Sequence, residues 1–202
     1  MNISSSDRVF FKLDQEKFTA QIINSPDASG NILIPCSIVH QSKEYFITCV
    51  NENSFSNNDK IQSIEFAKDS KLEMIDKNAF TNSSIESLEI PPSVTKIGEA
   101  AFQYCYNLKS VKIPENSKLH TIEKEAFSRC SIESIFIPSE VSQLNEKCFY
   151  FSFNLKNITI SKDNQNFLLI ENNFIVCESE KGSKIFDKII YANPKIDNNV
   201  TI

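Results

Sequence analysis

Apolar side chains recur along the middle of the chain in a fixed pattern. Five six-residue segments have apolar residues at their first, fourth and sixth positions: IQSIEF from Ile61, IESLEI from Ile85, LKSVKI from Leu108, IESIFI from Ile132 and LKNITI from Leu155. Their fourth residues lie 24, 23, 24 and 23 positions apart. Each segment predicts a short strand, because successive side chains of a strand point to opposite faces.

A second column is aromatic. A phenylalanine precedes each segment, at spacings of 25, 22, 25 and 22, and these residues are Phe55, Phe80, Phe102, Phe127 and Phe149. An aliphatic residue stands five positions before each phenylalanine, and a small residue stands directly before it. Both columns return after 47 residues, which indicates a unit of two repeats. We therefore expect a repeat array with the phenylalanines stacked in its core.

A period in the twenties with the pattern L-x-x-L-x-L is typical of leucine-rich repeats. The predicted fold is a β-rich leucine-rich-repeat solenoid, in which stacked repeats lay their strands side by side. It has a parallel concave sheet, an irregular or short-helical convex side, a β-type N-terminal cap and a C-terminal β-hairpin insertion. A cap is expected because the end of a solenoid otherwise leaves unpaired strand edges.

The period breaks near both ends of the chain, and these breaks predict its segments. They are a disordered N-terminus at 1–7, an N-terminal β cap at 8–49, five leucine-rich repeats in 47-residue double units at 50–160, an irregular hairpin module at 161–194 and the start of a truncated further repeat at 195–202. The last segment favours a fragment of a longer array.

One phrase of the repeat resembles a known family. AFQYCYNLKSVKIP, which begins at Ala101, combines Ala-Phe, a following Cys and a Pro after the strand, and these features recur in step over about residues 30–160. The phrase resembles the BspA-like, or Treponema pallidum-type, leucine-rich repeats. This resemblance implies a surface protein of a host-associated bacterium or anaerobic protist parasite, with a role in adhesion to host matrix or cell-surface proteins.

Composition narrows the partner classes. The 202 residues are 41% apolar and 23% charged with a net charge of −5, which suits one solenoid domain. No basic run is present, so nucleic acid is not an expected partner. The N-terminus has no signal-peptide pattern and no apolar run approaches the roughly 20 residues of a membrane span. The resemblance implies a cell-surface or extracellular location, and the missing signal keeps a cytoplasmic one open.

The six cysteines are predicted to be mainly structural. Cys105 and Cys130 stand three residues after a core phenylalanine, at a ladder position where leucine-rich repeats satisfy backbone groups of the adjacent loop. The other repeats have Asn58, Ser83 and Ser152 at this position, and Cys148 is in the small-residue column. Cys36, Cys49 and Cys177 are expected to be free thiols, with a bond between Cys36 and Cys49 as the alternative. The sequence contains no C-x-x-C pair, so no zinc site is expected.

Catalytic chemistry has no foundation in the sequence. His40 and His120 are the only histidines, and both are predicted to be surface residues in turns or loops. The sequence does not bring a nucleophile close to a base or pair two carboxylates at one position. It also has no Gly-rich phosphate-binding loop. We therefore expect that the chain is not an enzyme and that it has no catalytic residue, no cofactor and no metal site.

Two side chains of each strand are predicted to project from the concave sheet. The candidate partner-binding residues on this face are Glu65, Glu89, Lys112, Phe136, Asn157 and Thr159. Phe136 is the unusual member, because a large apolar ring on an exposed sheet needs a partner or a cover. Two interpretations fit these residues: a solvated face, or a groove for a protein or peptide.

A second candidate patch lies in the loops that lead into the strands. The 47-residue register brings Tyr104 and Tyr106 into correspondence with Phe151 and Phe153, beside Tyr150. Aromatic residues are enriched in binding surfaces. The same residues also fit a structural role in which they pack over the ladder residues.

Two functions remain open. The first, which the family resemblance implies, is a non-enzymatic, adhesin-like protein-binding module that contacts host extracellular-matrix or cell-surface proteins. The second is an intracellular scaffold or self-assembling repeat array that associates through its open C-terminal solenoid end.

Overall fold

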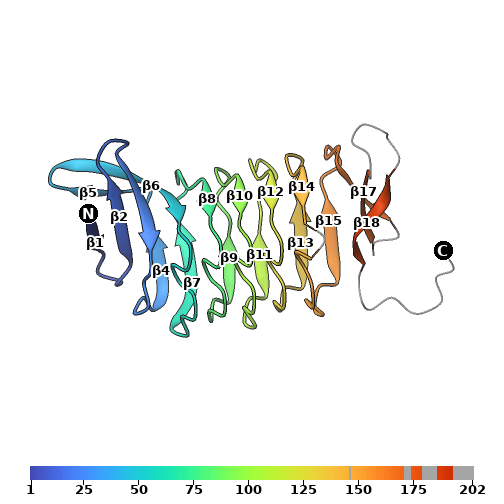
Figure 1. The fold of residues 1–202 in the computed structure, drawn as a ribbon, viewed down its shortest axis with the longest axis horizontal. Helices are drawn as coiled ribbons and strands as arrows, with labels where there is room; N and C mark the ends of the chain where they lie inside the picture. The colour runs from blue at the N-terminus through green and yellow to red at the C-terminus, as the bar shows by residue number, and fades with distance from the viewer. Residues whose placement is uncertain (146, 171–173, 179–185, 193–202) are drawn as a thin grey trace.

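The computed structural model describes residues 1–145, 147–170, 174–178 and 186–192. Within these ranges the chain forms strands and turns and no helix. The strands wind into an elongated solenoid whose coils are stacked in a row, with the N-terminus at one end and the C-terminal strands at the other (Figure 1). The predicted β-rich leucine-rich-repeat solenoid is confirmed.

The five apolar segments form the parallel strands of one face, which we call the front face. These strands are β7 (Ile61–Phe66), β9 (Ser87–Glu89), β11 (Ser110–Lys112), β13 (Ser134–Ile137) and β15 (Asn157–Ile160). Their inward residues are in register, so that Ile64 pairs with Leu88 and Leu88 with Val111. The pairing joins β7, β9 and β11, and separately β13 and β15, and it does not join β11 to β13. We call this interruption the seam.

One further strand extends the front face toward the N-terminus. Strand β4 (Gly30–Ile34) pairs in parallel with β7, with Ile32 opposite Ile64. The sequence assigns these residues to the cap, because the repeat register begins only at Val50. The structure shows that the front sheet begins before the first complete repeat.

The opposite side of the solenoid carries a second, narrow parallel sheet. Its two-residue strands are β8 (Met74–Ile75), β10 (Lys96–Ile97), β12 (Thr121–Ile122) and β14 (Gln143–Leu144), and β8 pairs with β6 (Lys43–Val50). The second residue of each pair is a buried aliphatic, while its backbone bonds to the neighbouring coils. The irregular or short-helical convex side expected from the sequence is therefore a strand ladder followed by turns.

The five core phenylalanines form a continuous stack between the two sheets. Neighbouring ring centroids from Phe55 to Phe127 lie 5.1, 5.1 and 5.2 Å apart, and those of Phe127 and Phe149 lie 5.9 Å apart. All five rings are buried. At the C-terminal end, Tyr191 packs edge-on against Phe149 at 5.6 Å.

The N-terminal strands continue the narrow sheet. Strands β1 (Asn2–Ser4), β2 (Phe10–Asp14) and β3 (Thr19–Ile23) pair antiparallel, β3 then pairs in parallel with β6, and β5 (Ser37–His40) pairs antiparallel with β6. The first seven residues, expected to be disordered, thus include a strand. Backbone pairing along the edge of β2 orders it, and Leu13 N also donates to Met1 O at 2.9 Å.

Three antiparallel strands follow the last repeat: β16 (Phe167–Ile170), β17 (Phe174–Glu178) and β18 (Phe186–Ala192). The sequence predicts β17 and β18 as a hairpin, and β16 adds a third strand. Residues 171–173, 179–185 and 193–194 of the predicted hairpin module and the further repeat at 195–202 lie outside the described residues.

Candidate functional site

The ladder residues fix the turns that lead into the front strands. Cys105 Sγ donates to the Phe80 carbonyl at 2.9 Å, and Cys130 Sγ donates to the Phe102 carbonyl at 2.9 Å. Ser152 Oγ makes the same bond to Phe127 at 2.6 Å. Each bond links a turn to the preceding coil, which confirms the predicted role of the ladder in satisfying backbone groups.

The cysteines are unbridged, and burial makes most of them unreactive. Cys36 Sγ donates to Asp69 O at 3.1 Å and Cys49 Sγ to Asn51 Oδ1 at 3.2 Å, so the two are not bonded to each other. Burial raises the pKa of Cys105 to about 11, and it raises the pKa of Cys130 well above 9.0. These thiols stay protonated at neutral pH, and the thiolate is the nucleophilic form.

The turns also contain a column of residues with left-handed backbone conformation. The residue two positions after each core phenylalanine has φ between 56° and 62°, and the column reads Asn57, Asn82, Tyr104, Arg129 and Phe151. Backbone bonds between coils hold the column in register, since Tyr104 N donates to Ser128 O at 3.0 Å and Arg129 N to Tyr150 O at 2.8 Å. Asparagine adopts this conformation readily, whereas other L-residues pay about 1 kcal/mol or more.

The predicted aromatic residues form two ring clusters on this side. The Tyr104 and Tyr106 rings lie 6.0 Å apart, while Phe151 lies 4.0 Å from Tyr150 and 5.6 Å from Phe153. Tyr106, Tyr150 and Phe153 are 59%, 50% and 54% exposed. Rings this exposed present a large apolar area to solvent.

Arg129 joins the two clusters into one surface. Its guanidinium carbon lies 5.4 Å from the Tyr104 ring centroid and 4.4 Å from that of Phe151, so the cation lies close to both rings. We call this surface the aromatic–arginine patch, and it comprises Tyr104, Tyr106, Arg129, Tyr150, Phe151 and Phe153. Sequence reasoning missed Arg129, although its place between Tyr104 and Phe151 in the left-handed column is a signal that could have found it.

The front-face candidates are spread along the sheet and partly satisfy one another. Lys112 Nζ lies 3.0 Å from Glu89 Oε2, and both side chains are more than half exposed. A shallow depression of about 320 Å³ lies over these residues and Glu65. Phe136 is half-buried and pairs in register with the exposed Thr159. Asn157, opposite Ser134 in this register, is also exposed.

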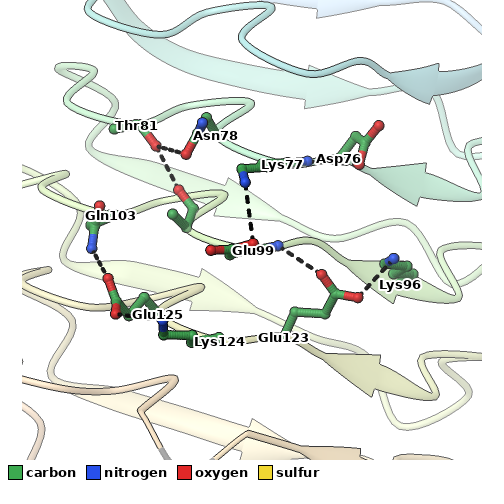
Figure 2. A network of polar contacts seen from close by, with 11 residues as sticks. Asp76, Lys77, Asn78, Thr81, Lys96, Glu99, Gln103, Glu123, Lys124 and Glu125 are labelled. Carbon is green, nitrogen blue, oxygen red and sulfur yellow. Dashed lines mark hydrogen bonds and ion pairs between the residues drawn. The ribbon is translucent and has the colours of Figure 1, made fainter.

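Charged groups on the turns after the narrow strands form a network of their own (Figure 2). Lys96 Nζ lies 2.8 Å from Glu123 Oε1, and Glu123 Oε2 accepts the Glu99 backbone N–H at 3.1 Å. Lys77 Nζ pairs with Glu99 at 3.3 Å. The hydrogen bond to Glu123 raises the pKa of Lys96. These charges neutralise one another across neighbouring coils and leave few groups for an outside ligand.

The two histidines are not brought together into a site. His40 ends β5, while His120 lies in the loop before β12 with Nδ1 3.1 Å from Glu140 O. The described ranges contain no group of three His, Cys, Asp or Glu side chains arranged to hold a metal. In the same ranges, no helix has the length and apolar character needed to cross a membrane.

Several solved structures share this fold. The pneumococcal vaccine antigen PcpA is 21% identical with a TM-score of 0.71, over 88% of this chain and 54% of the antigen. The T. pallidum leucine-rich-repeat protein TpLRR is 18% identical with a TM-score of 0.65, over 77% of this chain and 70% of that protein. A leucine-rich cell surface protein of Faecalibacterium prausnitzii is 20% identical with a TM-score of 0.52, over 89% of this chain and 59% of that protein. The chain thus spans about half the length of the pneumococcal antigen.

The sequence itself matches a repeat family. Comparison with curated proteins finds no match. The pattern of the BspA-type leucine-rich-repeat region, by contrast, matches in six copies, over residues 34–156 and 73–196. Together these matches span residues 34–196 and include all five predicted repeats. The chain therefore belongs to the BspA-type leucine-rich-repeat family.

Proposed function

We propose that this chain is a non-enzymatic, adhesin-like module of a surface protein, which binds host or matrix proteins through the aromatic–arginine patch. The observation that carries the proposal is the continuity of this patch. Arg129 links two ring clusters whose outer members, Tyr106 and Phe153, are about half exposed.

The composition of the patch matches that of protein interfaces. Tyrosine and arginine are among the residues that contribute most to binding, and they do so at the centre of an interface. Leucine-rich repeats are a fold usually used for protein binding, which supports a protein as the partner. Two proteins of similar fold are described as a vaccine antigen and a cell surface protein, and these descriptions support surface display here.

Surface display is tested by labelling intact source cells with an antibody to this domain, before and after permeabilisation. Signal on intact cells is the expected result. Signal that requires permeabilisation would contradict display and would favour an intracellular scaffold.

Binding is tested by surface plasmon resonance of the purified chain against a panel of matrix and cell-surface proteins. We expect at least one saturable interaction that Tyr106→Ser with Phe153→Ser weakens at least tenfold. Glu65→Ala with Glu89→Ala is the matched control, because it alters exposed residues of the front face. Loss of binding in the control alone would move the proposed site to the front face.

A further inference from the structure

We infer that the aromatic–arginine patch recognises a protein segment that presents a carboxylate next to an apolar side chain, with Arg129 as the group that binds the carboxylate. The inference rests on the proposed function and specifies its partner. It follows from the geometry and the charge of the patch.

The two rings hold the guanidinium in place. Its carbon is 4.4 Å from the Phe151 centroid and 5.4 Å from that of Tyr104. A guanidinium beside ring faces keeps its N–H groups in its own plane, and these can bind the two oxygens of one carboxylate. Arg129 is exposed, and its contact with two rings restricts the guanidinium, which lowers the conformational entropy lost when a carboxylate binds.

The charge of Arg129 has no partner within the described ranges. Three lysines pair across neighbouring coils: Lys77 with Glu99, Lys96 with Glu123 (Figure 2) and Lys112 with Glu89. Some other lysines of the described ranges, such as Lys109 and Lys118, form no ion pair. No carboxylate of the described residues forms an ion pair with Arg129. Arg129 differs from these lysines because its guanidinium lies against two rings, where an acidic group supplied by another protein could bind it.

The backbone places these residues in one column. Asn57 and Asn82 occupy the left-handed position in the first two repeats, and Tyr104, Arg129 and Phe151 occupy it in the next three. A second left-handed column, two positions before the core phenylalanines, likewise passes from asparagine to Ala100 and Glu125, so this conformation belongs to the turns and does not by itself mark a binding site. Its contribution is register, because it brings the guanidinium and the two rings onto one surface.

The rest of the patch defines what should lie beside the carboxylate. Tyr106 and Phe153 are the outer rings of the two clusters, and each exposes more than half of its surface. An acidic side chain bound at Arg129 would therefore be flanked by apolar rings. An apolar neighbour in the partner would bury those rings from water.

The test is selection of random dodecapeptides displayed on phage against the 202-residue chain, followed by affinity measurement on synthetic peptides. Peptides that also bind the Tyr106→Ser, Phe153→Ser variant are removed first. We expect the enriched peptides to share Asp or Glu beside an apolar residue. Replacing that acid by its amide should weaken binding at least tenfold.

Arg129→Asn is the matched variant, because asparagine already occupies the equivalent positions 57 and 82. It should keep the fold, as shown by an unchanged circular dichroism spectrum, and lose the preference for the acidic peptide. Arg129→Lys retains the charge without the planar group, and an intermediate affinity is expected.

The outcomes separate the two proposals. Peptides that depend on Tyr106 and Phe153 but carry no common acid, or that bind Arg129→Asn equally well, overturn the carboxylate inference and leave the protein-binding function standing. If no peptide and no protein of the panel binds the patch, both proposals are overturned.

Discussion

Phe102 lies between two parallel rings, at centroid distances of 5.1 Å from Phe80 and 5.2 Å from Phe127, and its side chain does not reach solvent. A side chain in such a column supports the coil on either side of it. Single residues of the stack should therefore matter more for stability than residues of similar size at the surface.

Phe102→Ala should lower the free energy of unfolding by about 3 to 5 kcal/mol, because it removes a buried ring and leaves a cavity. Urea denaturation followed by circular dichroism measures the change. Phe153→Ala is the control, since this ring is 54% exposed and its loss should cost less than about 1 kcal/mol. Equal losses for the two variants would contradict the stacked core.

The ladder position allows a finer test. Cys105→Ser should change the free energy of unfolding by less than about 1 kcal/mol, because serine makes the corresponding bond at position 152. Cys105→Ala should cost about 1 to 2 kcal/mol, since it removes the bond to the Phe80 carbonyl and opens a small cavity. Serine and alanine variants of equal stability would show that the bond contributes nothing.

At the scale of elements, the narrow strands depend on close approach of neighbouring coils. Gly98 directly follows β10, and a Cβ atom there would lie 2.7 Å from the backbone carbon of Asp76 and the backbone nitrogen of Lys77. Real side chains do not approach backbone atoms so closely. The glycine thus sets the spacing between two coils.

Gly98→Ala should therefore destabilise the chain by about 1 to 3 kcal/mol through overpacking, measured as a lower midpoint in urea. Ser93→Ala is a suitable comparison in the same coil, because it loses only a partly buried hydrogen bond to Ser70 O. A neutral Gly98→Ala would mean that the two coils can separate without cost.

The elements differ in how well the sequence predicts them. Each front strand has three apolar positions within six residues, a pattern long enough to recognise. A narrow strand such as Lys96–Ile97 has two residues and shows only one buried aliphatic. Its strand character comes from the coil beside it, which a single repeat does not reveal. The sequence assigns strand β4 to the cap for a related reason, since its residues precede Val50, where the repeat register begins.

The candidate site shows the same limit. The sequence predicts its aromatic members because their type repeats two coils apart, as Tyr104 and Phe151 do. Arg129 is of another type and lies in the coil between them, so a search for similar residues passes over it. A search by position, two residues after each core phenylalanine, would include it.

At the scale of the whole molecule, buried thiols couple stability to alkaline pH. Burial raises the pKa of Cys105 from 9.0 to about 11, while in the unfolded chain the thiol has its ordinary value. Above about pH 9 the unfolded chain releases this proton and the folded chain keeps it. The free energy of unfolding should fall between about pH 9 and pH 11, by up to about 1.4 kcal/mol per pH unit for this thiol.

Urea denaturation at pH 7, 9 and 10.5 measures the slope of the free energy of unfolding against pH. Cys105→Ser is the matched variant, because serine does not titrate in this range and its slope should be smaller. Identical slopes for the two proteins would exclude Cys105 as a source of the alkaline loss.

The seam in the front sheet gives the proposed binding site a mechanical consequence. Tyr104 belongs to the turn before β11, Arg129 to the turn before β13 and Phe151 to the turn before β15, so the patch crosses the interruption between β11 and β13. The narrow sheet and the phenylalanine stack continue through the coils on both sides of the seam, so only the front strands lack pairing there. A bound partner would span this gap. Local opening of β13 would then require loss of the partner's contacts, so binding should slow amide hydrogen exchange in β13 and leave exchange in the distant β4 unchanged.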